Sequence, residues 1–193
     1  QPERIQMGLL GAELTQEKNG LFRIGHIYQG ASYSPSLRSP LTEPGLEVSE
    51  GDYIIAVDGI PVKSVKNIYA LLVGKAGVLT ELTVNSKPSE SGARKIVVKP
   101  VADEYPLIHY EWVQHNIEYV DKASNGKIGY IYIPDMSAEG LNEFARYYYP
   151  QLDKEALIID DRENGGGNIS PMVIERLLRE PYRLTMRRGS DVI

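Results

Sequence analysis

"ALIIDDRENGGGN", residues 156–168, joins a run of apolar residues to two acids and then to three consecutive glycines. The apolar run predicts a buried strand, and Ser170 and Pro171 open a predicted helix just beyond the glycines. Amide groups in a glycine-rich turn between a strand and a helix N-terminus favour negative charge. The glycines therefore mark either a surface turn or a site for an anion or a developing negative charge.

The loop lacks the usual phosphate-binding patterns. No Lys-Ser/Thr pair ends it, as in a P-loop, and its glycines lack the G-x-G-x-x-G spacing of dinucleotide sites, so nucleotide binding is disfavoured. The functional alternative is an oxyanion hole, where an amide stabilises the charge of a tetrahedral intermediate. The adjacent acids Asp160 and Asp161 are compatible with a metal site, but a solvated strand end explains them more simply. We therefore expect no metal and no cofactor.

The segments before this loop predict a parallel sheet. Residues 127–134 have a strand pattern, and residues 140–152 a helical pattern that Pro150 stops. Strand, helix, strand, glycine loop and helix in this order are typical of parallel α/β units with right-handed crossovers. This half of the chain is therefore expected to begin a parallel α/β core.

A long helix is predicted ahead of these strands. It begins at Pro106, a residue that suits the first helical turn. Spacings of three and four place four side chains on one face, which we expect to pack against the segments that follow: Ile108, Trp112, His115 and Tyr119. The change of pattern puts a domain boundary near Ala102.

The first hundred residues predict a small sheet. Strand patterns cover four stretches: residues 21–28, 52–59, 79–85 and 95–99. Asp58 and Gly59 favour a tight turn, and residues 65–72 place apolar side chains on one face of a short predicted helix. Residues 29–46, rich in proline and glycine, read as an inserted loop, and a connection of that length is either functional or mobile.

A second glycine motif, "GLLGAEL" at residues 8–14, precedes these strands. An ordinary turn into a strand is one explanation. The other is a nest of amides that captures the terminal carboxylate of a peptide, with an adjoining strand and the residue 65–72 helix as the walls of a groove. On the second interpretation, four residues bind peptide C-termini with micromolar affinity: Leu9, Leu10, Gly11 and Ala12.

Composition disfavours several other classes of protein. The 21 Lys and Arg against 26 Asp and Glu give a formal charge of −5, without the basic cluster that nucleic-acid binding needs. The absence of cysteine excludes disulfides, thiolate zinc sites and a thiol nucleophile. No apolar run approaches the roughly 18 residues of a membrane span. Because the chain starts without methionine and ends at "GSDVI", we expect an excised piece of a longer protein.

Together these segments resemble the tricorn protease family, within the carboxyl-terminal-processing serine peptidases. "GKIGYIYIPDMSAEGLNEFARYYYPQL", residues 126–152, and the opening stretch are similar to the protease core of that family. "RSPLTEPGLEVSEGDYIIAVDGIPVKSVKNIYALLVGKAG", residues 38–77, resembles its PDZ domain with a long insertion. "EWVQHNIEYV", residues 111–120, resembles the helix that joins the two.

The resemblance implies an α+β chain. Residues 1–102 would form a PDZ-like small β-sandwich or barrel with a helix, including the insertion at residues 29–46. Residues 103–193 would form the linking helix and the N-terminal part of an α/β, parallel-strand serine-peptidase core. The implied function is that of a serine endopeptidase that degrades peptides through an acyl-enzyme. The alternative is a stand-alone peptide-binding PDZ scaffold without catalysis.

The resemblance also assigns roles around the glycines. The family pattern D-x-R-x-N-x-G-G falls on five residues: Asp160, Arg162, Asn164, Gly166 and Gly167. The amide of Gly167 would be the oxyanion-hole donor, with Asn164 and Arg162 holding the turn. The partners of the protein would be peptide substrates or peptide C-termini. The full-length protein could also form a homo-oligomer. The resemblance favours a cytoplasmic location and leaves a periplasmic one open.

Other family features are absent from these residues. The nucleophilic serine of the family would lie beyond residue 193 and the catalytic histidine before the PDZ domain, so this chain alone is expected to be inactive. His26, His109 and His115 match no catalytic position and are expected to be structural or surface residues. Thr185 and Met186 stand where the family carries an acid that favours basic substrate side chains, so that preference is not carried over.

Overall fold

The computed structural model describes residues 6–179, and the stretch with Thr185 and Met186 lies outside them. Contacts divide the chain into two compact units, and the division falls between Trp112 and Val113. Both residues belong to one continuous helix, α1 (Tyr105–Ala123). The expected domain boundary near Ala102 stays a prediction, since a division inside a helix does not define a domain limit.

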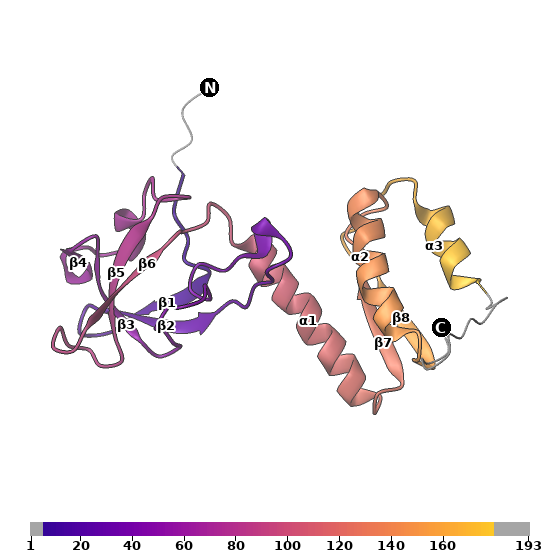
Figure 1. Cartoon of the computed structure of the whole chain (residues 1–193), viewed down its shortest axis with the longest axis horizontal. Helices are drawn as coiled ribbons and strands as arrows, with labels where there is room; N and C mark the ends of the chain where they lie inside the picture. Colours follow the sequence, from indigo (N-terminus) through magenta and orange to yellow (C-terminus); the bar gives the residue numbers. More distant parts are fainter. Residues whose placement is uncertain (1–5, 180–193) are drawn as a thin grey trace, which may run out of the picture. The chain divides into compact units, whose positions relative to one another are not determined.

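The first unit is built on a sheet in the order β1-β2-β3-β5-β6, with β4 paired to β3 (Figure 1). Its strands are antiparallel: β1 (Ala12–Gln16), β2 (Phe22–Ile27), β3 (Tyr53–Val57), β4 (Ile60–Pro61), β5 (Thr80–Asn85) and β6 (Arg94–Val98). The four strands expected from the sequence are confirmed, and β1 and β4 are additional. Ile24, Ile54 and Leu82 are completely buried in the aliphatic core between the sheet and the loops.

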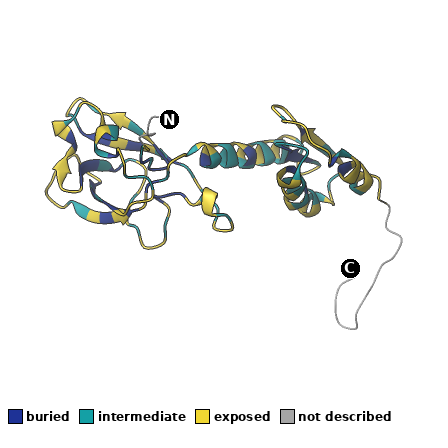
Figure 2. Ribbon diagram, turned by 90° about the horizontal axis from the view of Figure 1, so that it is seen from above, coloured by how far each residue is buried: buried dark blue, intermediate teal, exposed yellow. Residues whose placement is uncertain are grey.

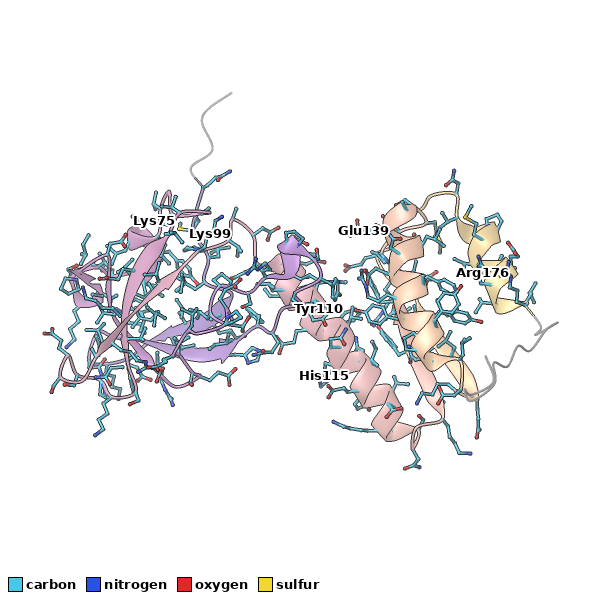
Figure 3. All side chains as sticks on the ribbon, in the orientation of Figure 1. Lys75, Lys99, Tyr110, His115, Glu139 and Arg176 are labelled. Atoms are coloured by element: carbon cyan, nitrogen blue, oxygen red, sulfur yellow. The ribbon has the colours of Figure 1, made fainter. Side chains whose placement is uncertain are left out.

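The Asp58–Gly59 turn joins β3 to β4 as expected. Both residues have positive φ angles, 46° and 77°, which is the backbone that a two-residue hairpin turn of type I′ requires. The Asp58 carboxylate pairs with Lys75, labelled in Figure 3, at 2.6 Å and accepts a hydrogen bond from the Glu81 N–H at 2.8 Å. These contacts tie the turn to the neighbouring strand and lower the pKa of Asp58.

The expected helix over residues 65–72 is wrong. A 3₁₀ turn, η3 (Ile68–Leu71), takes its place. Asn67 caps this turn by accepting a hydrogen bond from the backbone two residues on, at 3.0 Å. Gly74, with a φ of 72°, leaves the right-handed region shortly after it. The interval between the cap and the glycine is too short for an α-helix of several turns, although Ile68 is fully buried as a core residue should be.

The inserted loop at residues 29–46 packs against the core of the first unit, to which it belongs. Ser39 and Leu41 are 2% and 3% exposed, so the middle of the loop contributes to the interior. The Ala31 N–H donates to the Leu37 carbonyl oxygen at 2.8 Å and closes one bend. The segment is therefore an irregular part of the packed first unit.

The second unit contains the expected parallel pair, but the expectation that residues 156–160 form a buried strand is wrong, because Asp160 is the only buried residue among them. β7 (Ile128–Tyr132) and β8 (Ala156–Asp160) pair in parallel, α2 (Ala138–Tyr148) connects them beside the strands, and α3 (Ser170–Leu177) follows (Figure 1). β7 is covered on both faces, because Ile131 and Ile133 pack with α2 and α3 while Tyr130 and Tyr132 pack with α1. The register ends both strands at the same edge of the sheet.

The expected packing face of α1 is wrong, although the helix itself is confirmed. Its predicted core residues are exposed: Ile108, Trp112, His115 and Tyr119. The helix carries exposed as well as buried residues along its length (Figure 2), and His115 is labelled in Figure 3. Val113 is buried instead, with Ile117 and Val120 partly buried, against Tyr130 and Tyr132. These aliphatic side chains leave no polar atom unsatisfied when buried, whereas Trp, His and Tyr carry polar groups that need a hydrogen-bond partner in a buried position.

Candidate functional site

The loops that follow β7 and β8 lie side by side at the carboxyl edge of the parallel pair. The Met136 N–H donates to the Gly166 carbonyl oxygen at 2.8 Å, and the Met136 carbonyl oxygen accepts from the Asn168 N–H at 2.6 Å. These two bonds form a short bridge between Met136 and Gly167. The carboxyl ends of parallel strands are where α/β proteins place their ligand sites.

The three glycine amides differ in their partners. The Gly166 N–H donates to Asn164 Oδ1 at 2.8 Å, and the Gly165 N–H makes a longer contact of 3.3 Å with the Pro134 carbonyl oxygen. Within residues 6–179, no atom accepts a hydrogen bond from the exposed Gly167 N–H. Gly167 thus presents a donor that is free to bind an incoming oxygen.

The backbone at Gly167 requires glycine. Its φ is 143°, and a Cβ atom there would collide with the carbonyl oxygen of Met136. At Gly165 a Cβ would meet no atom within 4 Å. Gly167 is therefore required by the backbone geometry, whereas Gly165 leaves room for a side chain.

Asn164 fastens the loop to the end of β7. Its side-chain amide donates to the Ile133 carbonyl oxygen at 3.0 Å, while its Oδ1 accepts from Gly166. The preceding residue, Glu163, has a φ of 63°, so the chain turns sharply here. A single side chain thus links β7 to the middle of the glycine run.

The two adjacent acids have different environments. Asp160 is 7% exposed and accepts hydrogen bonds from the Tyr130 hydroxyl at 2.6 Å and from Arg162 Nε at 2.9 Å. The Arg162 guanidinium, helped by Tyr130, holds the pKa of Asp160 well below its usual range. Burial, together with the Asp160 carboxylate, raises the pKa of Tyr130 to about 12. Asp161 is exposed, as expected of a solvated strand end.

Three residues were missed by the sequence analysis: two tyrosines of the Asp160 network, and one aspartate in the loop after β7. Tyr130 binds Asp160, and the Tyr132 hydroxyl donates to the Arg162 carbonyl oxygen at 3.1 Å. Asp135, just ahead of α2, accepts from the Ser137 hydroxyl at 2.6 Å and from the Gly140 N–H in the first turn of the helix at 3.0 Å. The Asp-x-Ser spacing before a helix is a local capping signal that was available, whereas the two tyrosine contacts cross between strands.

The turn into β1 contains the four expected peptide-binding residues: Leu9, Leu10, Gly11 and Ala12. The Leu9 N–H donates to the Val101 carbonyl oxygen at 2.8 Å, and the Gly11 N–H donates to Glu104 Oε2 at 3.2 Å. Gly11 has a φ of 67°, as a nest of amides requires. Two of the four amides thus already have acceptors inside the chain.

Residues 8–103 match the sequence profile of the tricorn protease PDZ domain, and residues 127–189 match that of peptidase family S41. Over 185 residues the chain is 41% identical to tricorn protease homolog 1 of Streptomyces coelicolor, covering 95% of this chain and 17% of that protein. The chain belongs to the tricorn protease family. It is also 38% identical over 178 residues to the tricorn protease homolog of Saccharolobus solfataricus, covering 92% of this chain and 16% of that one.

The tricorn fold is matched in three dimensions as well. The crystal structure of the tricorn protease aligns with a TM-score of 0.84 at 30% identity, covering 97% of this chain and 18% of that one. The chain spans less than a fifth of the length of these relatives. Because the match runs from the PDZ domain into a peptidase family, the alternative of a stand-alone scaffold has no support.

His26, in the tricorn-type PDZ domain, lies between two carboxylates. Its Nδ1 is 2.7 Å from Glu50 Oε1, and its Nε2 is 2.7 Å from Glu111 Oε1. Burial alone would lower the pKa of His26, but the hydrogen bonds and charges of Glu111 and Glu50 outweigh it and raise the pKa above its ordinary 6.5. The ion pairs stabilise the fold below that ordinary value, and their contribution is lost as the pH rises through the raised pKa.

We expect Glu111→Gln to bring the pKa of His26 back towards its ordinary value, because one of the two charges on the ring is removed. The measurement is an NMR titration of the His26 imidazole in the 193-residue chain. Glu118→Gln is the matched control, since Glu118 lies on the same helix and pairs with Lys122 instead. A His26 titration that is identical in wild type and Glu111→Gln contradicts the structural account.

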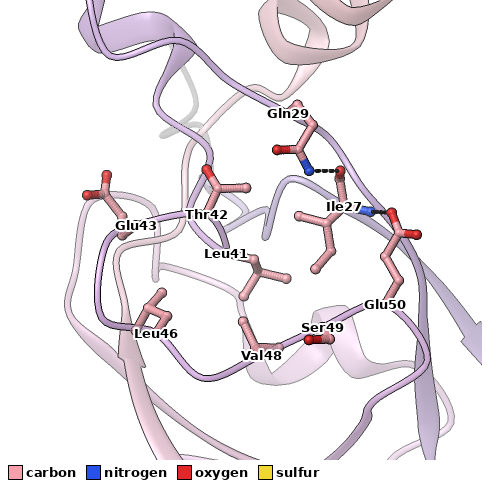
Figure 4. A pocket seen from close by; sticks show the side chains of 9 residues that line it. All are labelled: Ile27, Gln29, Leu41, Thr42, Glu43, Leu46, Val48, Ser49 and Glu50. Carbon is pink, nitrogen blue, oxygen red and sulfur yellow. Dashed lines mark hydrogen bonds between the residues drawn. The ribbon is translucent and has the colours of Figure 1, made fainter.

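A cavity of about 510 Å³ lies between the end of β2 and the inserted loop (Figure 4). Its apolar lining includes Ile27, Leu41 and Val48, and two carboxylates belong to its wall. Glu50 accepts from the Ile27 N–H at 2.9 Å, and Glu43 accepts from Arg38 Nε at 2.8 Å. Both carboxylates are therefore already engaged within the PDZ domain.

Residues 6–179 contain no group of three or more His, Asp or Glu side chains placed to hold a metal ion. None of the helices in this range has the length and apolar character needed to cross a bilayer.

Proposed function

We propose that the full-length protein is a tricorn-type serine endopeptidase that cleaves peptides through an acyl-enzyme. The observation that carries this proposal is the free Gly167 N–H at the carboxyl edge of the parallel strands, in a chain of a peptidase family. A serine contributed by another part of the protein attacks the scissile carbonyl. The Gly167 N–H then donates to the oxygen that becomes negatively charged in the tetrahedral intermediate.

The surrounding residues have positioning roles in this proposal. Asn164 holds the Gly166 amide and so orients the next peptide group, which carries the Gly167 N–H. Asp160 accepts hydrogen bonds from both the backbone N–H and the side chain of Arg162, which fixes the entrance to the loop. A donor fixed before the reaction stabilises developing charge without reorganising during it.

The PDZ domain binds peptides in this proposal. β1 is the end strand of its sheet and pairs only with β2 within residues 6–179. An extended peptide is expected to add along the free edge of β1, beside the turn at Leu9–Ala12. Peptide substrates or peptide C-termini are the partners in question.

We expect a fluorophosphonate probe to label one serine of the full-length protein, and that serine to lie outside residues 1–193. The 193-residue chain should remain unlabelled and hydrolyse no chromogenic peptide, because the family nucleophile and histidine map outside it. Mass spectrometry of the labelled peptide gives the position. A labelled serine within residues 1–193, or a full-length protein that takes up no label, contradicts the proposal.

A further inference from the structure

A carboxylate of the chain itself sits at the amide turn of the PDZ domain. Glu104, just ahead of α1, accepts the Gly11 N–H through Oε2 at 3.2 Å. The side chain is half-buried, and burial raises its pKa while the hydrogen bond from Gly11 opposes that rise. Chemically, this contact is the one that a peptide's terminal carboxylate would make with such a turn.

The beginning of α1 and the inserted loop close around the same glycine. Leu107 is completely buried, and its Cδ1 lies 3.1 Å from where a Cβ of Gly11 would stand. Pro40 Cδ and Ser39 Oγ both lie 2.9 Å from that point. Glu104 is thus one part of a packed shell around Gly11.

Ser39 supplies a second, independent sign of a ligand position. It is 2% exposed, and its hydroxyl has no hydrogen-bond partner among the described residues. A buried hydroxyl without a partner is costly, and it is normally satisfied by protein, water or ligand. The free hydroxyl and the Gly11 amide therefore offer two donors at one place, and Glu104 bonds only the amide.

We infer that Glu104 is the resident ligand of this turn and that it sets the specificity of the PDZ domain against free C-terminal carboxylates. This inference rests on the peptide-binding role proposed above. A peptide that ends at Gly11 must displace the Glu104 side chain, whereas a peptide that passes along β1 without a terminal carboxylate there need not. The unmodified domain therefore favours internal segments over chain ends.

The test compares the 193-residue chain with its Glu104→Ala variant. Acetate is titrated against each protein while the Gly11 amide resonance is followed by NMR. A degenerate hexapeptide pool is then added, either with free C-termini or fully amidated. Glu111→Ala is the control, because it loosens the same helix at His26 and leaves the Glu104 carboxylate in place.

We expect Glu104→Ala to bind acetate and the free-acid pool at least tenfold more tightly than wild type does, and the amidated pool unchanged. Equal acetate responses in wild type and Glu104→Ala, or none in either, overturn the inference. A tenfold gain in Glu111→Ala also overturns it, since the helix and not the carboxylate then controls access. An acetate response confined to Glu104→Ala, with neither pool bound, supports the resident carboxylate and contradicts the proposed peptide binding.

Discussion

If the full-length protein is the proposed peptidase, replacing its Gly167 N–H with an ester oxygen is expected to lower kcat about a hundredfold to a thousandfold. The replacement removes the proposed oxyanion donor and adds no Cβ, which would collide with the Met136 carbonyl oxygen. KM should change far less, because the carbonyl oxygen of the bound substrate carries less charge than the oxygen of the tetrahedral intermediate. Steady-state kinetics with a chromogenic peptide measure both constants.

Controls for this experiment come from the same loop. An ester at Gly165 removes only the long 3.3 Å contact with Pro134 and should leave kcat within a fewfold of wild type. Proline or alanine at position 167 does not isolate the donor, because its φ of 143° suits neither residue. If the Gly167 ester melts like wild type and keeps its kcat, the glycines form only a turn.

Asp160→Ala is expected to destabilise the β7–β8 region by about 2 to 3 kcal/mol, because it removes a buried acceptor of charged and neutral hydrogen bonds. The Tyr130 hydroxyl, which donates to Asp160 at 2.6 Å, then loses its acceptor in a buried position. Hydrogen exchange of the β7 and β8 amides in the 193-residue chain measures the loss of stability in this region. Asp161→Ala, at an exposed neighbour, should stay within about 0.5 kcal/mol of wild type.

The hydrogen bonds of Asp160 with Arg162 and Tyr130 also determine how the stability of the fold changes at low pH. The pKa of Asp160 is lowered in the folded chain, so its ion pair stabilises the fold above the ordinary carboxyl pKa. That contribution is lost as the pH falls below the ordinary value and through the lowered one. Equal exchange rates in the Asp160→Ala and Asp161→Ala variants, or an Asp160→Ala variant with wild-type acid sensitivity, contradict this account.

Much of the second unit was predictable because its signals are local. The apolar runs that became β7 and β8, the helical pattern between them and the glycines after residue 160 are each continuous in the sequence. The face of α1 was not predictable in the same way, since its aromatic stripe and its aliphatic stripe both have helical spacing. Packing against Tyr130 and Tyr132 selected the aliphatic one.

The contacts that the sequence did not predict join residues that are far apart in the chain. The hydrogen bond between Tyr130 and Asp160 joins residues 30 positions apart, and the one between Gly11 and Glu104 joins residues 93 apart. No periodicity or motif links such positions, because the fold alone brings them together. The Gly11 turn was recognised from its own sequence, but the carboxylate that fills it was not.

The backbone of Met136 makes the hydrogen bonds that hold the glycine loop. Its N–H donates to Gly166, and its carbonyl oxygen accepts from Asn168 and Ile169. Its side chain packs against the core cluster that contains Ile169. An apolar side chain of similar size therefore keeps both kinds of contact, whereas proline lacks the N–H that donates to Gly166. In evolutionary terms, a lineage can exchange Met136 for another apolar residue beside the Gly167 N–H without rebuilding the hydrogen bonds of the loop.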